Sequence, residues 1–194
     1  FLTRESFIVL LDENGNASLT PDQYNTATIQ TNCDLDRVEF SRTAFDCSDV
    51  GFFTIDVTAF DGNGLATTTQ ADVEIRDEIA PIFLTRESFI LELDANGNAS
   101  LTSDQYNTAT VQTNCDLDRI EFSRTDFGCG DTGFTTITVT AFDGNGLFAS
   151  TEADVEVRDV TAPTASARDI TVTLDAAGNA TITADDVNDG STDN

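Results

Sequence analysis

An internal repeat constrains this chain more than any other feature. Residues 83–164 repeat residues 1–82 with 62 of 82 positions identical, and a third copy begins at Pro163. Near-identical consecutive segments predict a tandem array in which each segment folds as one small unit. The predicted domains are residues 1–80, residues 81–162 and residues 163–194, the last being the N-terminal part of a third copy.

Apolar and polar residues alternate within each copy, which is typical of half-buried strands. In the second copy, Phe89, Leu91 and Leu93 are predicted to face inward. The sequence Asp-Gly-Asn-Gly at 143–146 separates two alternating runs and indicates a hairpin turn. No long helical period occurs. Six or seven short strands in about 82 residues predict an all-β fold, with each copy an antiparallel β-sandwich.

Shorter sequence motifs predict the turns and strands in the rest of each copy. Asp-Ala-Asn-Gly-Asn at 94–98 predicts a second hairpin, with a return strand over 99–102. Thr102 or Ser103 is expected to cap a helical turn. Two further extended runs are expected, over residues 108–113 and 119–123.

The composition excludes several functions. The net charge is -26 and all nine cationic residues are arginine, so the surface repels nucleic acid and anionic membranes. Histidine and lysine are absent, which excludes Ser–His, Cys–His and Schiff-base chemistry. The acids recur in register in each copy, unlike the single cleft of an enzyme, so we expect no catalysis. With no methionine and no apolar run near 18 residues, we expect the translation start and any membrane anchor to lie outside this fragment.

Four cysteines fall as one pair per copy, Cys33 with Cys47 and Cys115 with Cys129. The spacing does not match a zinc site, and no histidine completes one. We expect an intra-module disulfide in each copy, Cys33–Cys47 and Cys115–Cys129, with buried free thiols as the alternative. Persistent disulfides predict an extracellular or cell-surface protein.

Calcium is the expected cofactor, because Ca²⁺ takes six to eight oxygen ligands and acidic loops recur in each copy. The Asp-Leu-Asp sequences are favoured, since no turn requires them. Asp77, near the joint between copies, is expected to face the loops of the second copy. The predicted ligands are Asp34, Asp36, Asp77, Asp116, Asp118, Asp143, Asn145 and Asp159. The alternative is a soluble acidic surface with simple Asp-Gly and Asn-Gly turns.

Four longer motifs follow one another along the chain. They are F-D-C-S-D-V-G at 45–51, V-T-A-F-D-G-N-G at 57–64, V-E-I-R-D-x-x-A-P at 73–81 and P-x5-D-I-T-V-T-L-D-A-A-G-N-A-T-I-T-A-D-D-V at 163–187. In their order and spacing these motifs resemble bacterial hyalin-type (HYR-like) immunoglobulin-like repeats, and the likeness covers the whole chain. It implies an immunoglobulin-like fold, and long secreted or surface-attached proteins that are often adhesins. One departure is that threonine and alanine stand where the family often has a further cysteine, at Thr67–Thr69 and Ala149–Thr151.

An apolar patch is predicted on the outer face. The alternation of the first strand leaves Ile8, Leu10 and Ile90 facing outward, beside Phe52 and Phe60 on another strand. Repeated patches predict lateral contact in a homo-oligomer or filament. The alternative is that a loop or the neighbouring copy covers these side chains.

Together these features predict a structural spacer or fibre-forming segment of an extracellular, cell-surface adhesin-like protein, stiffened by Ca²⁺ and intra-module disulfides. The alternative is a ligand-binding adhesion module that recognises a carbohydrate or a surface. The expected partners of this chain are neighbouring repeats of the same chain and further copies in a homo-oligomer or filament. We expect no binding to nucleic acid, and no membrane contact within this fragment.

Overall fold

The computed structural model describes residues 1–194, and nearly all of its regular structure is β. The chain forms two compact units. The first comprises Phe1–Thr85, Thr108–Glu121 and Thr140–Thr151, and the second comprises Arg86–Asn107, Phe122–Val139 and Glu152–Asn194. No helix is long and apolar enough to cross a membrane.

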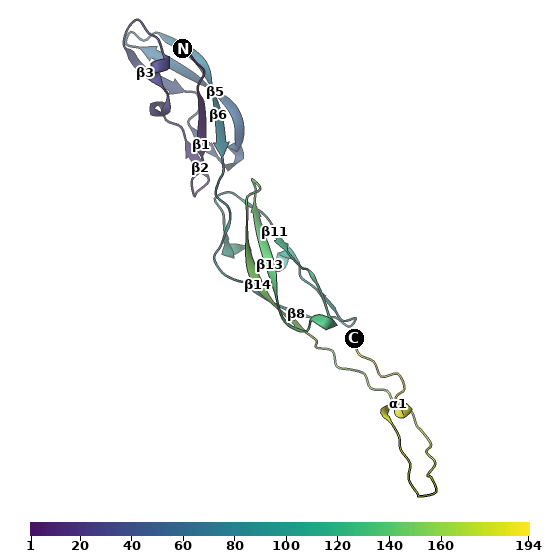
Figure 1. Ribbon diagram of the computed structural model, residues 1–194. Helices are drawn as coiled ribbons and strands as arrows, with labels where there is room; N and C mark the ends of the chain where they lie inside the picture. The colour runs from purple at the N-terminus through teal and green to yellow at the C-terminus, as the bar shows by residue number, and fades with distance from the viewer. The chain divides into compact units, whose positions relative to one another are not determined.

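The first copy is built on a four-stranded sheet with the order β1-β6-β5-β3 (Figure 1). Strands β5 and β6 form the predicted antiparallel hairpin, closed by a bond from the Asp61 N–H to the Leu65 carbonyl at 2.9 Å. Gly64 has φ +84° in this turn, a conformation that favours glycine. The strands are β1 (Ser6–Leu10), β3 (Leu35–Phe40), β5 (Gly51–Asp61) and β6 (Ala66–Arg76).

A second, smaller sheet pairs β2 (Asn16–Ser18) with β4 (Ala44–Asp46). Phe45 on β4 belongs to the same buried cluster as Val57 on β5 and Val73 on β6, and Ala17 on β2 packs against that cluster. The core therefore lies between two sheets, which makes the copy a β-sandwich.

The sandwich is not purely antiparallel, because β1 pairs with β6 in parallel. The Asp12–Asn16 turn explains this difference from the prediction. Its ends are tied by the Asp12 N–H to the Asn16 carbonyl at 2.8 Å, yet β2 beyond it pairs with β4. The turn thus carries the chain from one sheet to the other, so the hairpin predicted at this motif is wrong.

The second copy repeats this arrangement, with a four-stranded sheet of order β11-β13-β14-β8 and a two-stranded sheet of β12 and β9. The predicted inward residues Phe89, Leu91 and Leu93 are all buried. A further short pair joins β7 to β10. The strands are β7 (Ile82–Phe83), β8 (Ser88–Glu92), β9 (Asn98–Ser100), β10 (Val111–Gln112), β11 (Leu117–Phe122), β12 (Asp126–Gly128), β13 (Gly133–Asp143) and β14 (Phe148–Arg158).

Short 3-10 helices connect the strands. The predicted capped turn after Thr102 is present as η4, and the Thr102 N–H donates to Gln105 Oε1 at 2.8 Å. The expected extended run over 108–113 begins instead with η5 and becomes extended at β10. The six are η1 (Pro21–Gln23), η2 (Thr26–Thr28), η3 (Cys47–Asp49), η4 (Ser103–Gln105), η5 (Thr108–Thr110) and η6 (Cys129–Asp131).

The third copy has two isolated bridges and the short helix α1 (Ala184–Val187), and no regular strand. Val172 and Leu174, which match Leu91 and Leu93 of the second copy in sequence, are 42% and 64% exposed. In the first copy the matching side chains are covered by residues of the β5–β6 hairpin, and residues 163–194 include no counterpart of that hairpin.

Candidate functional site

The disulfide in the structure differs from the predicted pairing. Cys47 bonds to Cys115, with the two Cα atoms 5.7 Å apart and 68 positions apart in sequence. Cys33 and Cys129 carry free, exposed thiols. The predicted Cys33–Cys47 and Cys115–Cys129 disulfides are therefore corrected to one bond that joins the first copy to the second.

Strand geometry explains why Cys33 and Cys47 do not meet. Cys33 precedes β3, whose six residues carry the chain about 20 Å away. The strand that follows, β4, pairs with β2 and so does not return along β3. A disulfide requires Cα atoms within about 7 Å, so it would need a reversal after β3 that the chain does not make.

Gly15 makes room for the observed disulfide. A Cβ atom at this position would lie 2.5 Å from Cys47 Sγ and 2.4 Å from the Asn114 carbonyl oxygen, and Gly15 has φ +71°. Cys47 Sγ itself lies 3.5 Å from that carbonyl oxygen. The Asn-Gly sequence signalled a turn, but it did not signal that the turn is packed against a disulfide.

Close to this bond, Asp77 brings two loops of the second copy together. Its backbone is fixed locally, because the Ile79 N–H donates to Asp77 Oδ1 at 3.1 Å. Asn114 Nδ2 donates to the same oxygen at 2.8 Å, and Asn145 Nδ2 donates to Oδ2 at 3.0 Å. Asp77 therefore contacts the second copy through Asn145, one of the residues predicted as ligands, and through Asn114, which was not among them. Metal binding by Asp77 and Asn145 stays a prediction.

Asp143 is the buried carboxylate of this region, with 1% of its surface exposed. Its Oδ1 accepts the N–H groups of Asn145 and Leu147, both at 2.9 Å. Its Oδ2 has no partner, and neither do the buried Asn114 Oδ1 and Thr113 Oγ1. We call Asp77, Thr113, Asn114, Asp143 and Asn145 the joint cluster. Orphaned oxygens are costly to bury, and carboxylate, amide and hydroxyl oxygens are ligands that Ca²⁺ accepts.

The other predicted ligands lie in different surroundings. Asp36 pairs with Arg37 at 2.9 Å, and Asp118 pairs with Arg119 at 2.7 Å. These two carboxylates therefore already have cationic partners. No three Asp, Glu, Cys or His side chains form a group that could hold a metal ion. The joint cluster differs in that three of its five members are amide or hydroxyl residues.

Asp34 and Asp116 stabilise the neighbouring turns through their backbone carbonyl groups. The Gly62 N–H donates to the Asp34 carbonyl at 2.9 Å, and the Gly144 N–H donates to the Asp116 carbonyl at 2.8 Å. Asp159, the counterpart of Asp77, accepts a bond from Asn194 Nδ2 at 3.4 Å. The pairing of this aspartate with an asparagine thus recurs at the second joint.

The arginines that neutralise Asp36 and Asp118 also cover aromatic rings. The Arg37 guanidinium lies 3.8 Å from the centroid of Phe60, and Arg119 lies 3.7 Å from that of Phe142. The hydrogen bonds that Arg37 donates to the Glu39 and Asp36 carboxylates raise the pKa of Arg37. Phe60 is half-buried as a result, so its predicted place in the exposed patch is corrected.

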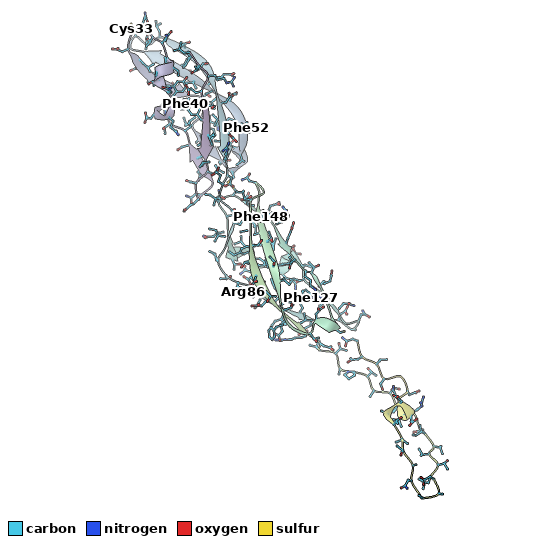
Figure 2. The ribbon with its side chains drawn as sticks, viewed as in Figure 1. Cys33, Phe40, Phe52, Arg86, Phe127 and Phe148 are labelled. Carbon is cyan, nitrogen blue, oxygen red and sulfur yellow. A yellow bond between two sulfur atoms is a disulfide. The ribbon has the colours of Figure 1, made fainter.

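The rest of the predicted patch is exposed. Phe52 on β5, labelled in Figure 2, is 81% exposed, and both it and Ile8 are register partners of Glu74 on β6. Because cross-strand partners point to the same side of a sheet, these side chains share the outer face. Leu10 and Ile90 are 52% and 57% exposed.

No protein-family model and no curated protein match the chain. Similar solved structures include the fibronectin(III)-like modules of Clostridium thermocellum CbhA, at 12% identity, 81% of this chain, 91% of that chain and TM-score 0.28. They also include human mucin-like protocadherin EC1-2, at 12% identity, 81% of this chain, 97% of that chain and TM-score 0.32. The human desmocollin-1 ectodomain matches at 12% identity, 84% of this chain, 40% of that chain and TM-score 0.32.

The fold class rests on the strands and the core rather than on these similarities. The chain is all-β, and its two complete copies are immunoglobulin-like β-sandwiches in tandem, each with a four-stranded sheet and a shorter second sheet.

Proposed function

We propose that this chain is a structural spacer or fibre-forming segment of an extracellular, cell-surface adhesin-like protein, in which the joint between copies is cross-linked. The Cys47–Cys115 disulfide is the observation that carries the proposal, because it connects one copy to the next. No catalytic role is assigned to any residue.

The position of the bond suits a segment that bears tension. A pull on the two chain ends cannot extend the residues enclosed by an intact disulfide. The separation of 68 positions encloses 67 residues. Persisting disulfides are typical of extracellular proteins, which is the location we propose.

The joint cluster is the proposed calcium site. Asp77 and Asp143 supply carboxylates, Asn114 supplies an amide oxygen and Thr113 a hydroxyl, and three of these side chains have a buried oxygen without a partner. Bound Ca²⁺ would supply positive charge at a buried carboxylate and oppose the self-repulsion of a chain with net charge -26. The side-chain amides of Asn114 and Asn145 hold the loops together through the hydrogen bonds that they donate to Asp77.

Melting in Ca²⁺ and in chelator at fixed ionic strength tests the site. A ligand at a hundredfold excess over its Kd stabilises the folded state by about 2.7 kcal/mol, which corresponds to several degrees in Tm. We expect Asp77→Asn to abolish this difference. Asp36→Asn, at an arginine-paired aspartate, is the control and should keep it. Equal Tm values in Ca²⁺ and chelator for the unchanged chain would contradict the site.

Force spectroscopy tests the spacer role directly. At a maximal 3.6 Å per residue, the 67 enclosed residues account for about 240 Å of extended length. We expect the oxidised chain to extend about 240 Å less than the reduced chain when both are fully unfolded. Equal extensions would contradict a load-bearing disulfide.

A carbohydrate- or surface-binding adhesion module is the second candidate. The exposure of Phe52 beside Ile8 favours it, since exposed aromatic rings contact sugars and surfaces. The same two side chains would also serve lateral contact between chains. Phe52→Thr should weaken binding to a glycan array if the ligand is a sugar. If the contact is lateral, it should instead lower the mass measured by light scattering at high concentration.

A further inference from the structure

The free thiol of Cys129 lies in the same setting as the bonded sulfur of Cys47. Cys129 Sγ is 3.6 Å from the Gly97 carbonyl oxygen, and Cys47 Sγ is 3.7 Å from that of Gly15. Cys129 Sγ is also 3.4 Å from the Asn194 carbonyl oxygen. The matching distance from Cys47 Sγ, to the Asn114 carbonyl oxygen, is 3.5 Å.

Gly97 leaves space here as Gly15 does at the first joint. A Cβ atom at Gly97 would lie 2.4 Å from Cys129 Sγ and 3.3 Å from the Asn194 carbonyl carbon, and its φ is +73°. Asn194 is anchored by its Nδ2, which donates to the Asp94 carbonyl oxygen at 3.1 Å. Its buried Oδ1 has no partner, as is also true of Asn114 Oδ1.

At the first joint, the residue directly after Asn114 is Cys115, the partner of Cys47. Asn32, at the position of the first copy that matches Asn114 of the second, is followed by Cys33. We infer that Cys129 is positioned as one half of a second inter-copy disulfide, and that it bonds to a cysteine thiol carried by a residue placed directly after Asn194. Asn194 already lies where it would place that residue next to Cys129.

The bond forms by thiol–disulfide exchange with a small disulfide such as oxidised glutathione. One protein thiolate attacks the small disulfide and releases one small thiol. The Cys129 thiolate then attacks the resulting mixed disulfide and releases the second. The two protein thiols are oxidised to one disulfide, and the small disulfide is reduced to two thiols.

Cys33 corresponds to Cys115, the other kind of cysteine in an inter-copy disulfide. It precedes β3 as Cys115 precedes β11, and Asn63 Nδ2 lies 3.4 Å from its sulfur. Each complete copy thus carries one cysteine of each kind, and disulfides would link every copy to the next. Of the four cysteines, Cys47 and Cys115 thus form one inter-copy disulfide, and Cys33 and Cys129 each carry a thiol of the kind that forms such a bond.

The test adds a single cysteine directly after Asn194 and equilibrates the chain in mixtures of oxidised and reduced glutathione. We expect peptide mapping to find Cys129 bonded to the added cysteine and Cys33 alkylated. In a matched chain, Gly-Ser-Gly-Ser separates Asn194 from the added cysteine. Because the displaced thiol is no longer held beside Cys129, we expect its equilibrium constant for the bond to be at least tenfold lower.

Two further variants sharpen the result. Gly97→Ala fills the space beside Cys129 and should lower the equilibrium constant of the directly added cysteine. Asn98→Ala, at the exposed position next to it, should leave the constant unchanged. Equal constants for the direct and displaced cysteines would overturn the inference, and so would a bond between Cys129 and a cysteine of a second chain. Calcium binding and glycan binding take no part in this readout, so a failure here is distinct from a failure of the proposed function.

Discussion

Two turns of identical sequence, Asp61–Gly64 and Asp143–Gly146, have different surroundings. In both, the aspartate Oδ1 accepts two backbone N–H groups at 2.9 Å. Asp143 is 1% exposed, whereas Asp61 is only partly buried. Beside Asp61 is a hollow of about 250 Å³ lined by Asn32, Leu35 and neighbouring residues.

The neighbouring asparagines differ in the same way. Asn145 Nδ2 donates to the Asp77 carboxylate, while Asn63 Nδ2 donates to the free thiol of Cys33. The local sequence therefore determines the turn, but the segment that precedes a copy determines whether the turn is buried. This comparison separates effects of the turn from effects of the joint, because each change can be made at both positions.

The largest effect is expected from the two cysteines next to these turns. Cys115→Ser removes a cross-link with a separation of 68 positions, which the chain-entropy model values at about 4 kcal/mol. Cys33→Ser changes a free thiol and should alter stability by less than about 0.5 kcal/mol. Denaturant unfolding under oxidising conditions measures both. Equal losses for the two variants would contradict the observed pairing.

The effect of Asp143→Asn on the free energy of unfolding should have opposite signs in chelator and in Ca²⁺. In chelator it removes a buried charge whose Oδ2 has no partner, while the amide oxygen can still accept the turn's N–H groups. We therefore expect stabilisation by about 1–3 kcal/mol. In Ca²⁺ it removes a ligand and should destabilise. Asp61→Asn is the control and should be nearly neutral in both. An Asp143 variant with the same effect in chelator and Ca²⁺ would exclude Asp143 as a ligand.

Asn145→Ala should have a smaller effect than either of these. It removes the bond to Asp77 at 3.0 Å, which we expect to cost about 1 kcal/mol. Asn63→Ala removes a weak contact with a thiol and should cost less. The difference between the two in thermal unfolding isolates the contribution of the joint. A larger loss for Asn63→Ala would show that the turn itself accounts for the effect.

The smallest effect concerns pH at the Asp94 turn. Backbone N–H groups of Asn98 and Asn96 lower the pKa of Asp94 below its ordinary 3.8. A lowered folded-state pKa contributes stability above the unfolded-state value, and this stability is lost as the pH falls through the folded-state value. Asp94→Asn keeps an acceptor but does not titrate, so stability should depend less on pH below 3.8. Asp22→Asn, at an exposed aspartate, is the control. An unchanged profile for Asp94→Asn would contradict this role.

The sequence predicted what alternation and turn chemistry determine. Phe89, Leu91 and Leu93 are buried as expected, and Ile8 and Leu10 are exposed. The β5–β6 hairpin follows from its Asp-Gly-Asn-Gly turn.

The sequence did not predict features that depend on long-range placement. Equal spacing within each copy suggested Cys33–Cys47, but in a tandem array the same spacing also allows pairing across copies. The parallel β1–β6 pairing depends on where β2 finds its partner, which alternation does not encode. The Asp-Leu-Asp sequences looked free to bind a metal, whereas adjacent arginines pair with Asp36 and Asp118.

Peptide mapping without reduction, after alkylation of free thiols, tests the central claim most directly. We predict one cross-linked peptide pair, Cys47 with Cys115, and alkylation of Cys33 and Cys129. Cross-linked peptides joining Cys33 to Cys47 and Cys115 to Cys129 would contradict the inter-copy joint and restore the intra-module pairing.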